Sequence, residues 1–381
     1  MPKSFDSRWT LSSAKLGGIL WVAIAVLVFS GRAPLGVIEL LFLLASLVVV
    51  PLGFGVLDRH GDGLRPAALG RAVRLLQPLG AVLAVVSLWF PPGRVAGALS
   101  SAWLAVGALT ALMAILDLFR PGWRALDRMV FNVARIDLAI AGCWFLTSRL
   151  GIAPMGFQEP IVLLTGVHFH YSGFATALIA GVTLKFCAQR RKSSLAAWIV
   201  AAAVLVPFLL AAGFVFSPLL RMIFALILAV TLLGFSLLQI SVARDFTSAM
   251  ARALLRIAAG LLIPGMLLVM VYAVGEYTGN YWLVIPQMAH LHGPLNGPGF
   301  VLLSLLAWVV EKSYRTHESC NRLRRSVLGL LISRMRGGRY EGRNHGWNGC
   351  LVTSIRARVT QRPSSSTTGC ADCAIAGCAS C

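Results

Sequence analysis

"APLGVIELLFLLASLVVVPLGFGVL", residues 33–57, decides the fold, because Glu39 is its only charged residue. A helix rises about 1.5 Å per residue, so a stretch of this length can cross the roughly 30 Å of hydrocarbon in a bilayer. A soluble domain would have no reason to repeat such a run, yet similar runs recur along the chain. This stretch therefore predicts a membrane-spanning helix.

Composition extends this prediction to most of the 381 residues. Charged residues make up only 13% of the sequence, whereas about 25% is ordinary for soluble domains. We predict an all-α membrane protein, a polytopic bundle of ten helices over residues 1–311 with a broken or kinked last span. The predicted spans are 16–30, 33–57, 72–90, 95–118, 129–150, 159–184, 194–214, 217–241, 253–275 and 284–310.

The net charge of +20 is explained by membrane topology rather than by nucleic-acid binding. Loops on one side of the predicted bundle, with their flanking residues, hold 14 Lys and Arg, and loops on the other side hold four. The positive-inside rule then places the N-terminus and the end of the tenth span in the cytoplasm. This pattern predicts a multi-pass protein of the bacterial cytoplasmic membrane with the lipid bilayer as its partner.

Two histidine pairs interrupt the apolar runs. The sixth span contains GVHFHYSGF, and the tenth contains HLHG. Counted from the outer ends of their spans, His168 and His170 lie about 13 and 16 Å deep, and His290 and His292 about 9 and 12 Å. An ionisable group in hydrocarbon is costly, at about 2.5–3.5 kcal/mol for a central charge. The matched depth therefore indicates a shared polar site.

The spacing within each pair limits its geometry. On a helix, residues i and i+2 point about 200° apart, so both histidines of a pair face one point only if the helix is distorted. Distortion is expected in the tenth span, where PQMAHLHGPLNGPGF holds three prolines and three glycines. Glu39 enters from the same side to about 9 Å. The candidate residues of a substrate or ion pathway are His168, His170, Tyr171, His290, His292, Asn296 and Glu39.

Two functions from different classes fit this pattern. The first is a transporter whose small-molecule or ion substrate passes the histidines, because broken helices at mid-depth form binding sites in transporters and histidine exchanges protons near neutral pH. The alternative is an intramembrane enzyme that depends on a transition metal or haem and acts on a lipid-phase substrate, with Tyr171 or Glu39 as acid or base. Its metal ligands would be His168, His170, His290 and His292. Either pair alone is also typical of ordinary hydrogen bonds between helices.

Both functions require the sixth and tenth spans to be neighbours. We expect at least one histidine of each pair to face the other across a polar cavity open to the outside, because an unpaired buried polar group costs about 1–3 kcal/mol. In the fifth span, Arg135 and Asp137 follow Asn132 by about one turn. We expect Arg135 and Asp137 to form an internal ion pair that holds helices together.

The motifs TGVHFHYSGFA and HLHGPLNGPGF resemble the YndJ-like family of bacterial integral membrane proteins, over about residues 10–312. The residues that carry the resemblance are His168, His170, Tyr171, Gly173 and Phe174 in the first motif, and His290, His292, Gly293, Asn296, Gly299 and Phe300 in the second. The resemblance implies a polytopic membrane protein of a family commonly described as transporters, without an assigned substrate or reaction.

Residues 312–381 depart from this pattern. They hold 12 Lys and Arg against 3 Asp and Glu and lack apolar periodicity, which predicts a disordered or atypical tail. The tail ends in a C-x2-C-x4-C-x2-C pattern, and four thiolates can bind zinc or an iron–sulfur cluster. However, four residues between the cysteine pairs are fewer than a zinc ribbon has. The cysteines are Cys370, Cys373, Cys378 and Cys381.

Overall fold

The computed structural model describes the backbone of residues 3–60, 66–190, 194–313 and 315. The predicted tail, with its four terminal cysteines, lies almost entirely outside these described residues. Residues up to Glu311 form one compact unit.

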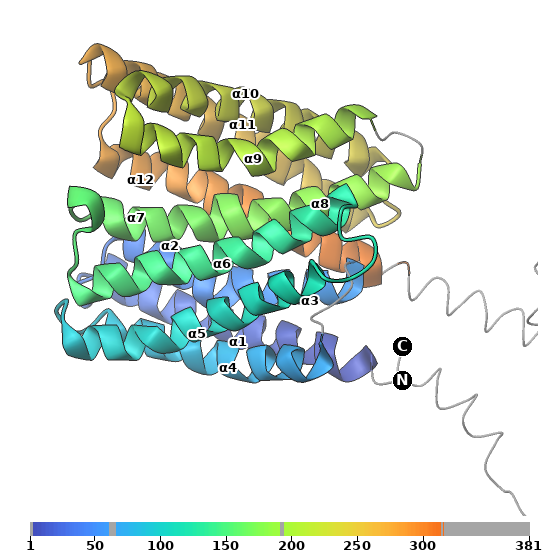
Figure 1. Cartoon of the computed structure of the whole chain (residues 1–381), viewed down its shortest axis with the longest axis horizontal. Coiled ribbons are helices and arrows are strands. Elements are labelled where there is room, and N and C mark those ends of the chain that lie inside the picture. The colour runs from blue at the N-terminus through green and yellow to red at the C-terminus, as the bar shows by residue number, and fades with distance from the viewer. Residues whose placement is uncertain (1–2, 61–65, 191–193, 314, 316–381) are drawn as a thin grey trace, which may run out of the picture. The chain divides into compact units, whose positions relative to one another are not determined.

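The described residues form helices and no strand (Figure 1). Ten helical stretches among them are long and apolar enough to cross a membrane, which confirms the predicted all-α bundle. In chain order, spans one to ten are Trp9–Phe29, Val37–His60, Ala67–Ser87, Arg94–Asp117, Leu126–Leu150, Ile161–Ala188, Ser194–Phe216, Pro218–Arg244, Ala249–Thr278 and Ile285–Ser313. The first span was predicted to begin at residue 16, but its helix α1 (Lys3–Phe29) begins earlier.

Seven spans are single helices and three are interrupted. Besides α1, the single helices are α4 (Ala67–Ser87), α5 (Arg94–Asp117), α6 (Leu126–Leu150), α9 (Ser194–Phe216), α10 (Pro218–Arg244) and α11 (Ala249–Thr278). Span two consists of α2 (Val37–Leu44), η1 (Ala45–Val49) and α3 (Val50–His60). Span six consists of α7 (Ile161–His168), η3 (Phe169–Ala175) and α8 (Thr176–Ala188), and a short 3₁₀ turn, η2 (Pro154–Gly156), precedes it. Span ten consists of α12 (Ile285–Pro294), η4 (Leu295–Leu302) and a helical continuation to Ser313.

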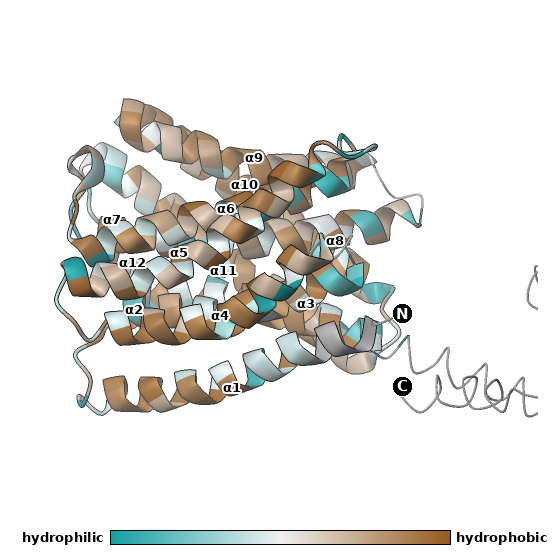
Figure 2. Cartoon of the chain, turned by 60° about the horizontal axis from the view of Figure 1, so that its bottom comes forward, coloured by the Kyte–Doolittle hydropathy of each residue, from teal (hydrophilic) through white to brown (hydrophobic). Residues whose placement is uncertain are grey.

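Spans two and six form the centre of this unit. The most apolar part of span two is 100% buried and that of span six is 83% buried, whereas spans one and seven are only 22% buried. The outward faces of the helices are mainly hydrophobic, and hydrophilic residues gather at the two ends (Figure 2). Polar side chains on the two central spans are therefore shielded from lipid by the surrounding helices.

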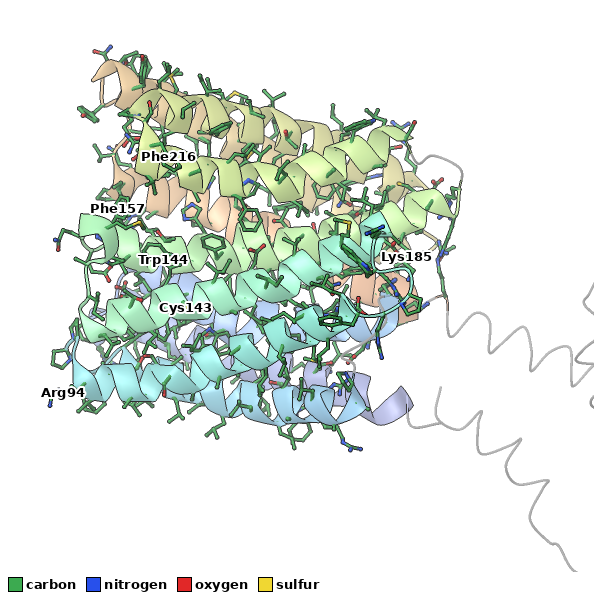
Figure 3. All side chains as sticks on the ribbon, viewed as in Figure 1. Arg94, Cys143, Trp144, Phe157, Lys185 and Phe216 are labelled. Atoms are coloured by element: carbon green, nitrogen blue, oxygen red, sulfur yellow. The ribbon has the colours of Figure 1, made fainter. Side chains whose placement is uncertain are left out.

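Successive loops alternate between two ends of the bundle. Arg94, Phe157 and Phe216 lie at one end, and Lys185 lies towards the other (Figure 3). We name the end near Lys185 the inner end, because the predicted cytoplasmic loops lie there, and the opposite end the outer end. The chain enters spans two, six and ten from the outer end.

Glycines set the short distance between span six and α6. A Cβ atom added to Gly173 would lie 2.8 Å from the carboxyl carbon of Asp137, and one added to Gly181 would lie 2.7 Å from the ring of Phe131. Small residues that let two backbones approach are typical of helix contacts in membranes. The close contact holds span six in the middle of the bundle.

Candidate functional site at three π-helical segments

Three π-helical segments meet in the middle of the bundle. Among the described residues, η1, η3 and η4 are the π-helical segments, and each contacts the other two. Such segments are rare and frequently occur at functional sites. They lie in the same three spans that carry the polar residues predicted from the sequence. Their junction is therefore the candidate functional site.

Segment η1 owes its wide turn to a proline and to a polar neighbour. Pro51 follows the segment and has no N–H to donate within the helix. The N–H of Val50 bonds the carbonyl of Ala45, five residues earlier, instead of four. The side-chain amide of Gln77, on α4, donates to the carbonyl oxygen of Ser46 at 3.0 Å. The Gln77 side chain, from span three, thus donates a hydrogen bond to a backbone carbonyl that loses its α-helical partner in η1.

Segment η4 contains its own proline. Pro298 removes the N–H that would bond the carbonyl of Pro294 in an α-helix. In a π-helix the backbone hydrogen bonds join residues five apart, so Gly299 takes the place beside this carbonyl. A Cβ atom on Gly299 would lie 3.1 Å from the carbonyl oxygen of Pro294. Pro298 therefore explains the break that the sequence predicted in span ten.

Segment η3 is held by hydroxyl groups. The Thr176 hydroxyl donates to the carbonyl oxygen of Tyr171, five residues earlier, at 2.9 Å. The Tyr171 hydroxyl donates to the carbonyl oxygen of Leu41 in span two at 2.8 Å. A Cβ atom on Gly297, in span ten, would lie 3.2 Å from the Tyr171 ring. Tyr171 is thus a fixed contact between all three interrupted spans, which confirms that spans six and ten are neighbours.

His168 and His292 flank this junction, at the end of α7 beside η3 and on α12 near η4. The Nδ1 atom of His168 lies 2.8 Å from the carbonyl oxygen of Leu164. A carbonyl only accepts, so Nδ1 carries the proton and Nε2 presents its lone pair. His168 is exposed and His292 is partly buried. One histidine from each predicted pair thus flanks the junction of the π-helical segments.

His292 has two alternative partners at the same ring nitrogen. Its Nδ1 atom lies 3.0 Å from the carbonyl oxygen of Gly265 on α11 and 2.9 Å from the amide nitrogen of Asn296. The carbonyl requires a proton on Nδ1, whereas the amide N–H requires a lone pair there. The amide nitrogen also donates to the main-chain carbonyl of His292 at 2.8 Å, which fixes its orientation. His292 can therefore change its protonation without leaving Nδ1 unpaired.

Gly265 makes this arrangement possible, because a side chain there would collide with the site. A Cβ atom on Gly265 would lie 2.7 Å from the amide nitrogen and 3.1 Å from the amide oxygen of Asn296. The absence of a side chain lets α11 approach α12 closely enough for its carbonyl to reach His292.

The other histidine of each pair lies apart from this site. His170 is fully buried, its Nε2 accepts from the indole N–H of Trp103 at 3.0 Å, and its Nδ1 donates to the carbonyl of Gly166 at 2.7 Å. Both of its ring nitrogens are therefore occupied. His290 is exposed near the outer end, and its Nδ1 donates to the carbonyl of Pro286 at 2.7 Å. His170 and His290 are thus predicted pathway residues that the structure does not place beside His168 and His292.

Glu39 lies at the outer end and not within the bundle. Its predicted depth of about 9 Å is wrong, because the helix begins at Val37 rather than at residue 33. The Glu39 carboxylate accepts from the N–H of Gly36 at 2.9 Å and so caps α2. Both Glu39 and Glu159, which accepts from a backbone N–H of α7, lie close enough to Arg149 to interact with its charge. These groups form an electrostatic cluster at the outer end.

The ion pair expected between Arg135 and Asp137 does not form. Arg135 donates instead to the side-chain oxygen of Asn132 at 2.6 Å, and the amide of Asn132 donates to Asp117 at 3.0 Å. Residues two apart point to different sides of a helix, which explains why the pair is not made. Asp137 remains buried with its Oδ1 atom lacking a hydrogen-bond partner.

Within the described residues, the structure does not bring the four histidines together as ligands of one metal ion. No group of three or more His, Cys, Asp or Glu side chains within the described residues is close enough to hold a metal ion. A recess in the described part of the chain lies at the inner end, away from the histidines. It is lined by Ala125, Asp127, Arg128, Phe131 and Lys185. The polar cavity expected beside the histidines stays a prediction.

Sequence reasoning missed residues that shape the site. Trp103 and Gly265 lie in apolar runs, and nothing in those runs marks the indole N–H or the close approach of two helices. Gln77 is a polar residue in the predicted third span, so its polarity was a signal of a buried hydrogen bond.

Comparison with known proteins agrees with the two histidine motifs. Residues 40–300 match the YndJ-like protein family. The chain is 28% identical over 298 residues to the uncharacterized membrane protein YndJ of Bacillus subtilis (strain 168), a match that covers 78% of this chain and 53% of that protein. The chain therefore spans about half the length of this relative. No solved structure matches the chain. Because the matched residues cover most of the chain and both motifs, this membrane protein belongs to the YndJ-like family.

Proposed function

We propose that this protein is a transporter of the bacterial cytoplasmic membrane, whose small-molecule or ion substrate passes the pair His168 and His292. The observation that carries the proposal is the position of His292, with two alternative partners for Nδ1, near the junction of three π-helical segments that His168 also flanks. The proposed site takes Tyr171 and Asn296 as the polar groups that position it. We assign His170 to packing and Glu39 to helix capping.

The chemistry of the pair suits a transient ligand. The Nε2 atom of His168 presents a lone pair, and His292 can supply either a lone pair or a proton without leaving Nδ1 unpaired. A site that has to release its substrate needs such exchangeable contacts rather than a rigid set of ligands. The bundle positions both histidines in the outer half of their spans, since each lies seven residues after the first residue of its span.

The π-helical segments support a moving rather than a rigid site. Irregular backbone at membrane depth is tolerated where it is buried in protein or lines a watery path, and interrupted spans form the binding sites of many transporters. A π-helical turn can return to the α-helical register by moving one backbone hydrogen bond, which rotates the residues beyond it. Segment η4 is fixed by Pro298, which has no N–H to restore the α-helical bond. We propose that such a change in η3 opens and closes the path beside His168 and His292.

The enzyme alternative receives no such support. A bound metal ion would need several of the four histidines together, and in the described residues His170 is occupied on both nitrogens and no group of three ligands occurs.

Flux across a reconstituted membrane tests the proposal. Purified protein in liposomes is assayed with a panel of monovalent and divalent cations, amino acids and sugars, in the presence and absence of a pH gradient. We expect uptake of at least one class, which His168→Ala and His292→Ala abolish. His290→Ala is the matched control, because His290 lies on the same helix but apart from the pair, and it should retain uptake. Equal flux with and without protein over the whole panel would contradict the proposal, as would equal losses in all three variants.

A further inference from the structure

Asp137 is a buried carboxyl group at the middle of span five. It lies 11 residues after the first residue of α6, Leu126, and 13 residues before the last, Leu150. Its exposed fraction is 2%, and its Oδ1 atom has no hydrogen-bond partner. An ionised carboxylate in such a place would lack both water and donors, which is among the most costly arrangements in a membrane protein.

Among the described residues, no charged group offsets this burial. Arg135, on the same helix, bonds to Asn132, and in the described residues no charged side chain lies close enough to Asp137 to counter the effect of burial. The helices packed around it carry few titratable groups. These are Arg94 and Asp117 on α5, His168 on α7, His170 and Tyr171 on η3, and Lys185 and Cys187 on α8. Helix α9 has no titratable side chain. His170 and Tyr171 already have hydrogen-bond partners, so neither is available to pair with a carboxylate.

The Asp137 carboxyl lies directly against the π-helical segment of span six. A Cβ atom on Gly173 would lie 2.8 Å from the carboxyl carbon and 2.9 Å from Oδ2. Only glycine leaves room for the carboxyl group at this point. The carboxyl therefore contacts the backbone of the segment whose register we propose to change during transport.

We propose that Asp137 is a proton-binding site that couples proton movement to rearrangement of η3, an inference that rests on the transporter function proposed above. In the present arrangement the carboxyl is neutral. When η3 rearranges, water reaches the carboxyl, the O–H bond breaks, and the proton passes to water while its electron pair stays on the carboxylate. Rebinding of a proton allows the segment to close over a neutral group again.

A proton fits this place better than a metal cation does. A bound cation such as calcium requires six or more oxygen ligands, and magnesium requires an octahedral set. No group of ligands that could hold a metal ion occurs in the described residues, whereas a proton needs only one carboxyl oxygen.

Infrared spectroscopy of the protein in membranes tests the protonation directly. We expect a carbonyl band of a protonated carboxylic acid at neutral pH that is lost in Asp137→Asn. The matched control is Asp117→Asn, because Asp117 is also buried but accepts from Asn132 at 3.0 Å and pairs with Arg120 at 3.6 Å. The Asp117→Asn variant should keep the band. Identical carbonyl spectra for wild type and Asp137→Asn would overturn the proposal.

Flux measurements test the coupling separately. In liposomes, Asp137→Asn should bind substrate but no longer respond to a pH gradient, because asparagine mimics the neutral carboxyl and cannot release a proton. Wild-type pH dependence in this variant would overturn the coupling while leaving the transporter function intact. If wild-type protein shows no flux at all, the transporter function fails, and the infrared band still decides whether Asp137 is protonated.

Discussion

The indole N–H of Trp103 can only donate, and its partner in the centre of the bundle is Nε2 of His170. The two rings also stack, with centroids 5.7 Å apart. Replacing His170 by Ala would leave the buried indole N–H without an acceptor, which costs about 1–3 kcal/mol in addition to the cavity. We predict a clear loss of thermal stability for His170→Ala, measured by unfolding of the purified protein in detergent.

A double-mutant cycle isolates the hydrogen bond from the loss of volume. Trp103→Phe and His170→Phe should each destabilise the protein, and the double variant should be less destabilised than the sum of the two, because both polar partners are then gone. Additive effects would show that the bond contributes little and would return His170 to the group of candidate pathway residues.

Gly265 offers a second test at the residue scale. In Gly265→Ala the new methyl group would displace the Asn296 amide, which lies 2.7 Å from the position of the added Cβ atom. We predict that uptake falls as in His292→Ala, while overpacking costs about 1–3 kcal/mol of stability. Gly260→Ala is the matched control on the same helix, because no atom lies within 4 Å of its added Cβ. Comparable flux losses in the two variants would contradict the role assigned to Gly265.

At the scale of single elements, η3 depends on a hydroxyl group. Thr176→Val keeps the shape of the side chain but removes the hydrogen bond to the carbonyl of Tyr171. We predict faster backbone hydrogen exchange in η3, measured by mass spectrometry on protein in nanodiscs, because a carbonyl outside the α-helical register loses its partner. Thr110→Val is the control, since Thr110 bonds the carbonyl of Val106 within an ordinary helical turn. Unchanged exchange in η3 would show that the hydroxyl does not maintain the segment.

The N-terminus of α11 depends on a carboxylate from span ten. Buried Glu311 accepts from the N–H and hydroxyl of Thr247 and from the N–H of Ser248, at 2.9–3.1 Å. We predict that Glu311→Gln lowers the free energy of unfolding by about 1.5–3 kcal/mol, since the bonds are made to a charged acceptor. The control Glu276→Gln, which breaks a partly exposed pair with Arg221, should cost only about 0–1 kcal/mol. Thermal unfolding in detergent measures both, and a smaller effect at Glu311 would contradict this role.

At the scale of the whole molecule, the sequence predicted the bundle well, because each span corresponds to its own run of apolar residues. It also predicted the contact between spans six and ten, since histidines in hydrocarbon need partners. It could not separate His168 from His170, because that distinction depends on Trp103, a residue 67 positions away from His170. It misplaced Glu39 because hydropathy marks apolar residues and not the first turn of a helix. The break in span six depends on the Thr176 hydroxyl, and the break in span two depends on Pro51 together with the amide of Gln77. A periodic pattern of apolar residues does not reveal these hydrogen bonds.

The orientation of the whole molecule is the prediction on which the outer position of the site depends. Phe157 and Phe216 lie at the outer end with Arg94, and Lys185 lies towards the inner end (Figure 3). With the eight native cysteines replaced by serine, single-cysteine variants at these positions report their side of the membrane. We predict that Phe157→Cys and Phe216→Cys react in intact cells with a maleimide that cannot cross the membrane, and that Lys185→Cys reacts only after the membrane is opened. The reason is the excess of Lys and Arg in the inner loops, because membrane insertion retains positively charged loops in the cytoplasm.

Reporter fusions after Lys192 and after Tyr281 provide an independent measurement of the orientation, with a cytoplasmic signal expected only for the first. A cytoplasmic signal after Tyr281, or labelling of Lys185→Cys in intact cells, would invert the bundle and place His168 and His292 in the inner half of the bilayer.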